Sequence, residues 1–350
     1  MDLLGSRPRS LRANRGLTVV LVDARKPPLD KACGEGLLPD GVAALAELGV
    51  RVNSGDAVAL RGRFLADGTK AEGRFGERWA LGIRRTVLHR ILTERACDVG
   101  VTMHWGKRID LRPGKVPALQ GEPIKCDWTV GADGCGSRVR VVAHLKPVSE
   151  RHRIGVRQHF RVKPWSDFIE VHWHERGQAY VTPVTANELC VAVIGYETLS
   201  MEQIAPLFPA LAERINGSAP SSSSKGSISS STVLNAVVRN RVVLVGDASG
   251  SVDAITGNGL SLAFRQAILL AEALAENDPR LYQRHHRRVC RRAETMARML
   301  LLMGGHAWIC RRAIQALAAR PEGFDRFLAF HARGTTPLRS KELPVSSPSF

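Results

Sequence analysis

One segment, Val242 to Leu260, constrains the fold of this chain more than any other. Four apolar residues, Val242 to Val245, are followed by Gly-Asp, which predicts a buried strand ending at the carboxylate of Asp247. A glycine-rich turn at residues 257–259 then predicts a helix from about Leu260 to Ala275. The carboxylate therefore lies beside a helix N-terminus, whose free amides at residues 257–260 attract anions. The segment predicts an α/β domain and a ligand with hydroxyl groups and negative charge.

The segment resembles the second flavin-binding motif of the para-hydroxybenzoate hydroxylase-like flavoproteins, which include the geranylgeranyl reductases. This resemblance implies that Gly246 and Asp247 bind the ribityl chain of FAD. It also implies that the backbone of Gly257, Asn258 and Gly259 covers the N1/O2 edge of the flavin ring. Taken alone, glycine and aspartate at this position are also explained by turn geometry.

Two further segments follow the order of the same family. Residues 128–140 resemble its Asp-Gly motif, which implies that Asp133 and Gly134 lie near the flavin. Residues 82–90 resemble its Arg-x-x-Leu helix start, which implies that Arg85 binds the FAD pyrophosphate. A planar guanidinium suits that role because it can donate to two phosphate oxygens. Taken alone, Arg85 is also explained as a solvated helix residue.

The N-terminal region matches the family only in part. Residues 16–23 predict a fully buried strand, and in nucleotide-binding α/β folds an acid at this place, here Asp23, binds the adenosine ribose. The Gly-x-Gly-x-x-Gly turn that opens the family is missing, because residues 1–12 contain only Gly5. We therefore expect weak FAD binding, and a non-catalytic remnant of the family is the alternative to an active enzyme.

The loop from Lys31 to Pro39 resembles the Lys-x-Cys-Gly-(Gly/Glu)-Gly loop of geranylgeranyl reductase-like flavoproteins. The resemblance implies a loop that passes over the flavin and lines the substrate side. Cys33 and Glu35 are therefore candidates for contact with substrate or flavin. A tight turn before a helix at residues 41–48 explains the loop equally well, and no catalytic acid, base or nucleophile is assigned.

The resemblance implies an α/β fold (α+β overall), with a Rossmann-like FAD/NAD(P)-binding parallel sheet and an antiparallel substrate domain. The FAD-binding domain would comprise residues 1–55, 85–145 and 233–280. The substrate domain would comprise residues 56–84 and 150–215, with alternating strands at 154–161, 168–174, 178–184 and 189–195. A serine-rich run at 216–232 predicts a flexible connector, and residues 281–335 predict basic C-terminal helices.

The formal net charge of +17 bears on partners. Arginines at 284–292 and 311–312 flank the apolar residues 299–303, which would suit peripheral association with an anionic membrane or an acidic partner. Solvated arginine faces explain the same charge without a partner. Nucleic acid is not expected, because no recognised motif is present and only 5% of residues are aromatic. The oligomeric state is not predicted.

Residue usage predicts a reduced, cytoplasmic setting. No apolar run reaches the length of a membrane span or a signal-peptide core, and the seven cysteines include no Cys-x-x-Cys pair. Glu170, His172 and His174 alternate on one face of a strand, an arrangement able to bind zinc. No further ligand follows at a convincing spacing, so we expect an exposed polar strand face and no metal.

These features together predict an FAD-dependent oxidoreductase that takes electrons from NAD(P)H. It would act on a small hydrophobic or aromatic substrate in one of two ways. It would be a monooxygenase that hydroxylates an aromatic or polyketide-like molecule, or a reductase of an isoprenoid-like alkene. Tyr180 and Pro183 resemble part of an aromatic-Phe-Pro sequence of the reductases. In both cases the cofactor supplies the chemistry and the protein supplies position and electrostatics.

Overall fold

Two parallel strand pairs carry the predicted nucleotide-type motifs. In the computed structural model, which describes residues 17–197 and 201–333, β1 (Val20–Asp23) pairs with β6 (Thr102–Trp105). β10 (Thr129–Gly131) pairs with β18 (Val242–Leu244), and β17 (Val238–Arg239) extends that pair. Parallel strands end at the same edge of a sheet, so the turns after β10 and β18 lie side by side.

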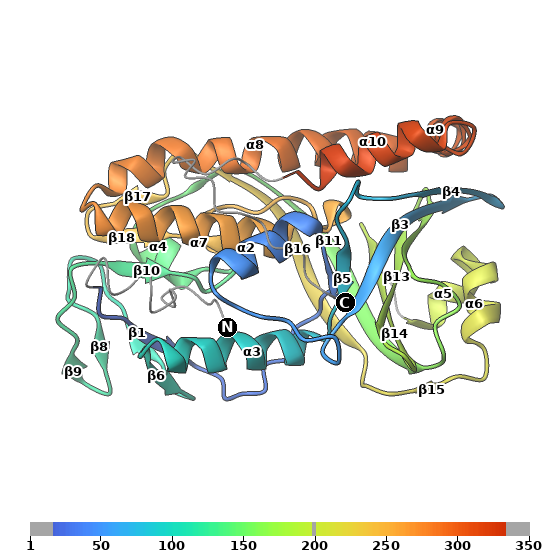
Figure 1. Ribbon diagram of the computed structural model, residues 1–350. Helices are drawn as coiled ribbons and strands as arrows, with labels where there is room; N and C mark the ends of the chain where they lie inside the picture. Colours follow the sequence, from blue (N-terminus) through green and yellow to red (C-terminus); the bar gives the residue numbers. More distant parts are fainter. Residues whose placement is uncertain (1–16, 198–200, 334–350) are drawn as a thin grey trace.

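Helices cover these strands on two sides (Figure 1). α7 (Gly259–Ala275) begins one residue before the predicted start and ends where predicted. Its Leu269, Leu270 and Ala273 pack on the buried Val243 and Leu244 of β18. The long α8 (Pro279–Gly304) lies over α7, and α3 (Arg85–Asp98) lies on the opposite side beside β6. The shorter α2 (Pro39–Glu47) and α4 (Arg138–Val142) complete this part.

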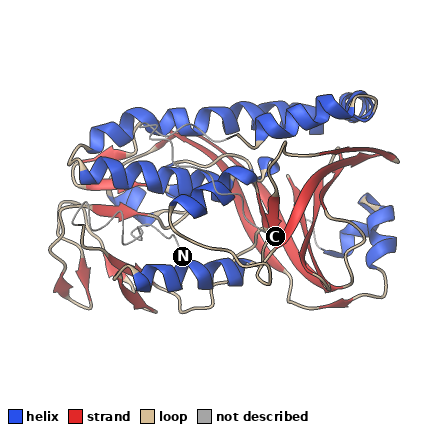
Figure 2. Ribbon diagram, in the orientation of Figure 1, coloured by secondary structure: helices blue, strands red, loops and turns tan. Residues whose placement is uncertain are grey.

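A ten-stranded sheet forms the other half of the molecule (Figure 2). The four strands predicted from alternating residues are confirmed as β11 (Pro147–Arg161), β12 (Phe168–His174), β13 (Gly177–Thr185) and β14 (Glu188–Gly195). The remaining strands of the sheet are β2 (Gly36–Leu37), β3 (Val58–Ala66), β4 (Thr69–Gly73), β5 (Ala80–Gly82), β15 (Ala219–Pro220) and β16 (Lys225–Leu234). Neighbouring strands are antiparallel except β12 and β3, which are parallel.

Further helices pack on this sheet. One face is covered by α5 (Ile204–Leu207) and α6 (Pro209–Ile215), with Phe208 and Leu211 buried against β13 and β14. The opposite face packs on α9 (Ala307–Ala318) and α10 (Pro321–His331). The other short elements are β7 (Ile109–Asp110), β8 (Ala118–Leu119), β9 (Glu122–Pro123), η1 (Met201–Gln203), η2 (Gly246–Ser249) and η3 (Ala254–Thr256). Within the described residues, no helix combines the length and apolarity that crossing a bilayer requires.

Composition predicts a flexible connector at residues 216–232, and this prediction is wrong for its second part, which lies in a strand. Residues 225–234 form β16, which pairs with β11 from Lys225 to Leu234. Ser230, Thr232 and Leu234 are buried at alternate positions, so the period of two that marks a strand is carried mainly by small hydroxyl side chains. The hydroxyl of Thr232 donates to Glu150 at 3.2 Å, which satisfies it inside the sheet.

The prediction of a fully buried strand at residues 16–23 is also wrong. β1 begins at Val20, which is 43% exposed, and only Leu21 of the strand is buried. Among the described residues β1 pairs with β6 alone. A strand paired on one side keeps part of its surface in contact with solvent, whereas a central strand of a parallel sheet is covered on both faces.

Candidate functional site

β10 and β18 bring the Asp-Gly and Gly-Asp motifs together. The amide of Val245 donates to the carbonyl of Gly131 at 3.0 Å, so the two strands stay paired up to the turns. A Cβ at Gly131 would lie 2.7 Å from Leu244 and 2.8 Å from Val139. Glycine is therefore required for this close approach of strand and helix.

The carboxylate of Asp133 turns back on its own chain. Its Oδ1 accepts the hydroxyl of Ser137, and its Oδ2 accepts the amides of Arg138 and Val139 at 2.7 and 3.2 Å. It therefore stabilises the N-terminus of α4. Contact between Asp133 and a flavin remains a prediction.

The side chain of Asp247, like that of Asp133, reaches solvent. Protein atoms nevertheless enclose it closely enough that burial raises the pKa of its carboxyl. The neighbouring Cys135 thiol and the charges of Lys31 and Arg85 oppose that increase. A solvent-accessible carboxylate deep in the molecule is available to accept hydrogen bonds from a ligand.

The amides before α7 are free only in part. The amide of Gly257 donates to Ala254 O at 3.0 Å, and the amide of Asn258 donates to Thr256 Oγ1 at 3.3 Å. The amides of Gly259 and Leu260 belong to the first helical turn and have no acceptor within the helix. They remain for an anionic ligand, whose charge the helix dipole of α7 favours.

Five glycines of the predicted motifs border open space. They are Gly34, Gly134, Gly136, Gly257 and Gly259, and a Cβ built on any of them would meet no neighbouring atom within 4 Å. Gly134 and Gly257 also adopt φ of 85° and 65°, which favours glycine. Room beside the backbone is what the close approach of a planar ring and its phosphates requires. The residues present therefore fit a bound FAD.

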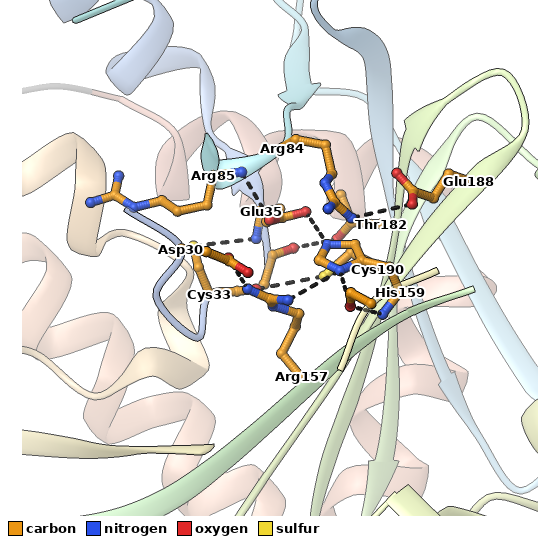
Figure 3. A network of polar contacts seen from close by, with 12 residues as sticks. Asp30, Cys33, Glu35, Arg84, Arg85, Arg157, His159, Thr182, Glu188 and Cys190 are labelled. Carbon is orange, nitrogen blue, oxygen red and sulfur yellow. Dashed lines mark hydrogen bonds and ion pairs between the residues drawn. The ribbon is translucent and has the colours of Figure 1, made fainter. Parts of the chain in front are cut away.

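Arg85 begins α3, as the sequence predicts. Figure 3 shows its guanidinium directed away from Glu35. Burial and the charge of Arg85 lower the pKa of His89 to about 4, while Asp23 acts in the opposite direction. Arg85 also opposes the increase in the pKa of Asp247. These charged groups therefore interact from Asp23, at the end of β1, to Asp247, in the turn after β18. The predicted roles of Asp23 on ribose and of Arg85 on pyrophosphate remain predictions, and the missing glycine turn lies outside the described residues.

The loop from Cys33 to Gly36 is clamped onto the large sheet (Figure 3). The hydroxyl of Thr182 on β13 donates to Gly34 O at 2.8 Å, and the thiol of Cys190 on β14 donates to Cys33 O at 3.5 Å. Gly36 then pairs with β5. Backbone and side-chain bonds thus fix the position of the loop relative to the sheet.

Glu35 is the centre of this clamp. It is 2% exposed, and its Oε1 accepts the amide of Arg85 at 2.8 Å. Its Oε2 lies 2.6 Å from Nε2 of His159 on β11, which has no exposed surface. The Nδ1 of His159 lies 2.8 Å from Ser222 Oγ. One carboxylate therefore joins the start of α3 to the sheet.

Arg157 supports the same loop from below. Its side chain is 1% exposed, forms an ion pair with Asp30 and donates to Lys31 O at 3.1 Å. Burial raises the pKa of Asp30, but Lys225 and Arg157 outweigh it and hold the pKa below its usual value. A buried guanidinium with a paired carboxylate tolerates burial better than either group alone.

The hydrogen bonds around Glu35 and the protonated thiols limit the chemistry that this clamp could carry out. Burial raises the pKa of the Cys33 and Cys190 thiols, so neither is a thiolate at neutral pH. Glu35, His159 and Cys190 offer metal-ligand atoms within 4.8 Å of one another. However, Glu35 and His159 already satisfy each other, and the Arg157 guanidinium 3.1 Å from His159 Nδ1 disfavours another cation. The cluster is a hydrogen-bonded clamp. A contact of Cys33 or Glu35 with substrate remains a prediction.

The expectation of an exposed polar face at Glu170 and His172 is wrong. Both residues are buried, and Glu170 pairs with Arg63 and lies 3.2 Å from His172 Nε2. Burial raises the pKa of Glu170, but His172 and Arg63 outweigh it and hold the pKa at about 2. His174 packs its ring against Phe208. Helices α5 and α6 cover this face, which the strand pattern alone does not reveal.

Sequence reasoning missed Arg157, His159 and Cys190. Arg157 and His159 alternate on β11 and point to the same face, and both are fully buried. Two buried basic residues at a spacing of two in a strand are a usable signal, because such groups need buried partners. Those partners, Asp30 and Glu35, lie in a loop more than 120 residues earlier, with separations of 127 and 124 positions.

His286 anchors the turn that carries Asp247. It projects from α8, and its Nε2 lies 2.8 Å from Ser249 Oγ in η2. The Ser249 hydroxyl also lies 2.8 Å from Gly246 O. Burial and the neighbouring charge of Arg287 lower the pKa of His286 to about 4, so the imidazole is neutral near pH 7.

This depressed pKa predicts acid sensitivity. The folded pKa lies below the unfolded value of about 6.5, so the stabilisation is complete above pH 6.5 and is lost as the pH falls towards 4. For this residue alone the expected loss by pH 4 is on the order of 2–3 kcal/mol. Urea denaturation at both pH values should show a smaller loss for His286→Gln than for the unmodified chain. The exposed His152→Gln serves as the control, and an equal loss in all three would contradict the assignment.

Comparisons with known proteins agree with this geometry. Residues 10–279 match a family model described as FAD binding domain. Over 336 aligned positions the chain is 25% identical to the menaquinone reductase of Mycolicibacterium smegmatis, covering 85% of this chain and 82% of that protein. It is 23% identical to the menaquinone reductase of Mycobacterium tuberculosis, covering 78% of this chain and 74% of that protein.

Solved structures share the fold. A flavoprotein/dehydrogenase from Cytophaga hutchinsonii has a TM-score of 0.77 at 17% identity, covering 93% of this chain and 89% of its own. 2-Methyl-3-hydroxypyridine-5-carboxylic acid oxygenase has a TM-score of 0.70 at 22% identity, covering 84% of this chain and 88% of its own. The predicted architecture, a parallel nucleotide-type region joined to a largely antiparallel sheet and C-terminal helices, is therefore confirmed.

Proposed function

The chain belongs to the FAD binding domain family of FAD-dependent oxidoreductases, and from that membership we propose that it is an NAD(P)H-dependent reductase of an isoprenoid quinone. The observation that carries the proposal is the clamped loop at Cys33 to Gly36, which resembles the loop of the geranylgeranyl reductases. The similarity to menaquinone reductases along most of the chain supports the quinone class. An isoprenoid quinone is also a hydrophobic molecule with a ring, as the sequence predicts for the substrate.

The chain's own residues would divide the work of holding FAD. Asp247 would accept hydrogen bonds from the ribityl hydroxyls, and the amides of Gly259 and Leu260 would hold the anionic edge of the ring. Arg85 would bind pyrophosphate and Asp23 would bind the ribose. When bound, FAD supplies the transfer of two electrons between the nicotinamide donor and the substrate. The loop held by Glu35 would form the wall on the substrate side.

Replacing Asp247 by alanine should weaken FAD binding by about 1–3 kcal/mol, because a charged hydrogen-bond acceptor for the ribityl chain is lost. His174→Ala should leave FAD affinity unchanged, because His174 packs against Phe208 on the other face of the sheet. Titration followed by flavin fluorescence measures both. Chromatography of the extracted chromophore should identify FAD, since FMN lacks the groups assigned to Asp23 and Arg85. Equal weakening by both substitutions, or FMN alone, would contradict the site.

The proposed activity is tested by turnover without oxygen. Purified protein with FAD, menaquinone and NADH or NADPH should oxidise the donor anaerobically, and mass spectrometry should show a product heavier by two hydrogens. One hydrogen comes with the electron pair of the donor and the other is a solvent proton. Asp247→Ala should lose the activity in proportion to its FAD occupancy, which separates specific turnover from background.

A second candidate is the monooxygenase, which the structural similarity to 2-methyl-3-hydroxypyridine-5-carboxylic acid oxygenase favours. Donor oxidation that requires oxygen, with one oxygen atom added to the substrate, would replace the reductase proposal with this one. A chain that binds no FAD in titration and shows neither activity would instead be the non-catalytic remnant. The three outcomes differ in cofactor binding, oxygen requirement and product mass.

A further inference from the structure

The outer surface of α8 and α9 is both basic and apolar. We define the α8–α9 face by its exposed residues, which are Arg284, Arg288, Arg291, Arg298, Met299, Leu302, Trp308 and Arg312. Figure 1 shows α8, α10 and α9 along one edge of the molecule, with α7 beneath α8. The outer side of α8 is therefore turned away from the cofactor motifs.

Helical spacing places the α8 members of this face in one stripe. The intervals from Arg284 through Arg288, Arg291 and Arg298 to Leu302 are four, three, seven and four residues, which return to the same side of a helix. The arginines are spread along the helix from Arg284 to Arg298, and Met299 and Leu302 follow near its C-terminal end. On the next helix, α9, the exposed Trp308 and Arg312 are also four residues apart and share one side.

The charge of the molecule is concentrated in this region. Residues 279–333 contain twelve arginines and three acidic residues. Within the described parts of the chain, no acidic side chain pairs with Arg288, Arg291, Arg298 or Arg312. Arg284 pairs with Asp278 at 3.3 Å, where 64% of the arginine side chain is exposed, so this pair is weak. The face is therefore a strongly positive surface.

Large apolar side chains are exposed at one end of the same surface. Trp308 is 69% exposed, Leu302 is 60% exposed and Met299 is 47% exposed. The core does not need them, because the inward side of these helices already supplies Leu300, Met303, Cys310 and Ile314 to it. Exposed tryptophan and leucine beside arginine are typical of helices that lie at a membrane surface.

We propose that the α8–α9 face docks on an anionic lipid bilayer, with the arginines on the phosphates and Trp308, Leu302 and Met299 inserted at the headgroup level. Charge complementarity selects this partner, because the unpaired arginines need anions and the apolar residues need a water-poor environment. A nucleic acid would satisfy the arginines but would leave Leu302 and Met299 in water. The proposal does not depend on the substrate, because bilayer binding needs no turnover.

The test is sedimentation with vesicles, using the full chain with FAD added. Vesicles of phosphatidylcholine alone should bind little protein, and vesicles that also contain phosphatidylglycerol should bind it, less so as salt increases. The variant Arg288→Glu/Arg291→Glu/Arg298→Glu should lose at least about a hundredfold of this binding. The unmodified chain should keep part of its vesicle binding at high salt, and the variant Leu302→Ser/Trp308→Ser should lose this salt-resistant part. Neither variant alters a residue of the cofactor or loop cluster.

A matched control separates a defined face from total charge. Arg108→Glu/Lys115→Glu/Lys125→Glu makes the same charge change at exposed positions around the β7–β9 sheet, and it should retain vesicle binding within a few-fold. Equal loss in the control would overturn the assignment to α8 and α9. So would the absence of binding to anionic vesicles, or tighter binding to duplex DNA than to vesicles. Circular dichroism confirms that each variant is folded. Failure of quinone reduction alone would leave this result unaffected.

Discussion

Replacing Glu35 by alanine is expected to lower the free energy of unfolding by about 3–5 kcal/mol. The substitution removes the carboxylate that accepts the amide of Arg85 and contacts His159, both in a buried environment. The ring of His159 then stays buried without its partner, and an unsatisfied buried polar group is costly. Urea denaturation of the apoprotein measures the change. Glu77→Ala, at an exposed position, should stay within about 0.5 kcal/mol.

Further variants separate the carboxylate from its backbone position. Glu35→Gln keeps an acceptor of the same shape and should cost only about 1–2 kcal/mol. Glu35 has φ of 56°, so Glu35→Gly should be about 1–2 kcal/mol more stable than Glu35→Ala through relief of backbone strain. The same angle explains why glycine also suits this position in the loop pattern. If Glu35→Ala costs as much in a His159→Ala background as in the unmodified chain, the two side chains do not interact.

The substitution Gly82→Ala should have the larger effect, at least about 5 kcal/mol or complete loss of folded protein. A Cβ there would lie 1.8 Å from the backbone oxygen of Pro183 and 2.9 Å from Leu60 Cδ1. A backbone oxygen in a sheet cannot rotate away as a side chain does, so β5 and β13 would have to separate. Thermal denaturation and proteolysis of the expressed protein measure the loss.

Gly34→Ala and Gly136→Ala are the matched controls for this change. A Cβ at either position meets nothing within 4 Å, and neither residue has a positive φ. We expect their stability without FAD to change by less than about 1 kcal/mol. If Gly82→Ala folds with the stability of these controls, β5 does not approach β13 as closely as the structure has it.

Local patterns predicted the regular parts of the fold. The bounds of β12 agree with the prediction at both ends, and those of α7 agree within one residue, because apolar periodicity and a glycine turn mark them directly. The strand β16 was missed because serine and threonine replaced the apolar residues that normally reveal the period of two. The burial of Glu170 was missed because the covering helices are invisible to a pattern within one strand.

Family motifs predicted the site residues, but they could not predict the contacts that these residues make. The motif named Glu35, but its bond to His159 joins a loop to a strand 124 residues later. The motif named Asp133, but its carboxylate caps the helix that follows it. Side-chain direction at such places depends on long-range packing, which a single sequence does not encode in any local spacing. Only the structure shows that the carboxylate of Asp133 bonds the start of the next helix, whereas that of Asp247 lies beside the Cys135 thiol.

The pairing of β10 with β18 has a consequence for how the chain is assembled during translation. The two strands join residues 129–131 to residues 242–244, whereas β13 pairs with its sequence neighbours β12 and β14. Nearby contacts form sooner than contacts that close a long segment. We therefore expect the hairpins of the large sheet to form while β18 is still inside the ribosome, and the edge that carries Asp247 to be completed after them. A nascent chain stalled before residue 242 should consequently resist protease in the hairpins and remain unable to retain FAD.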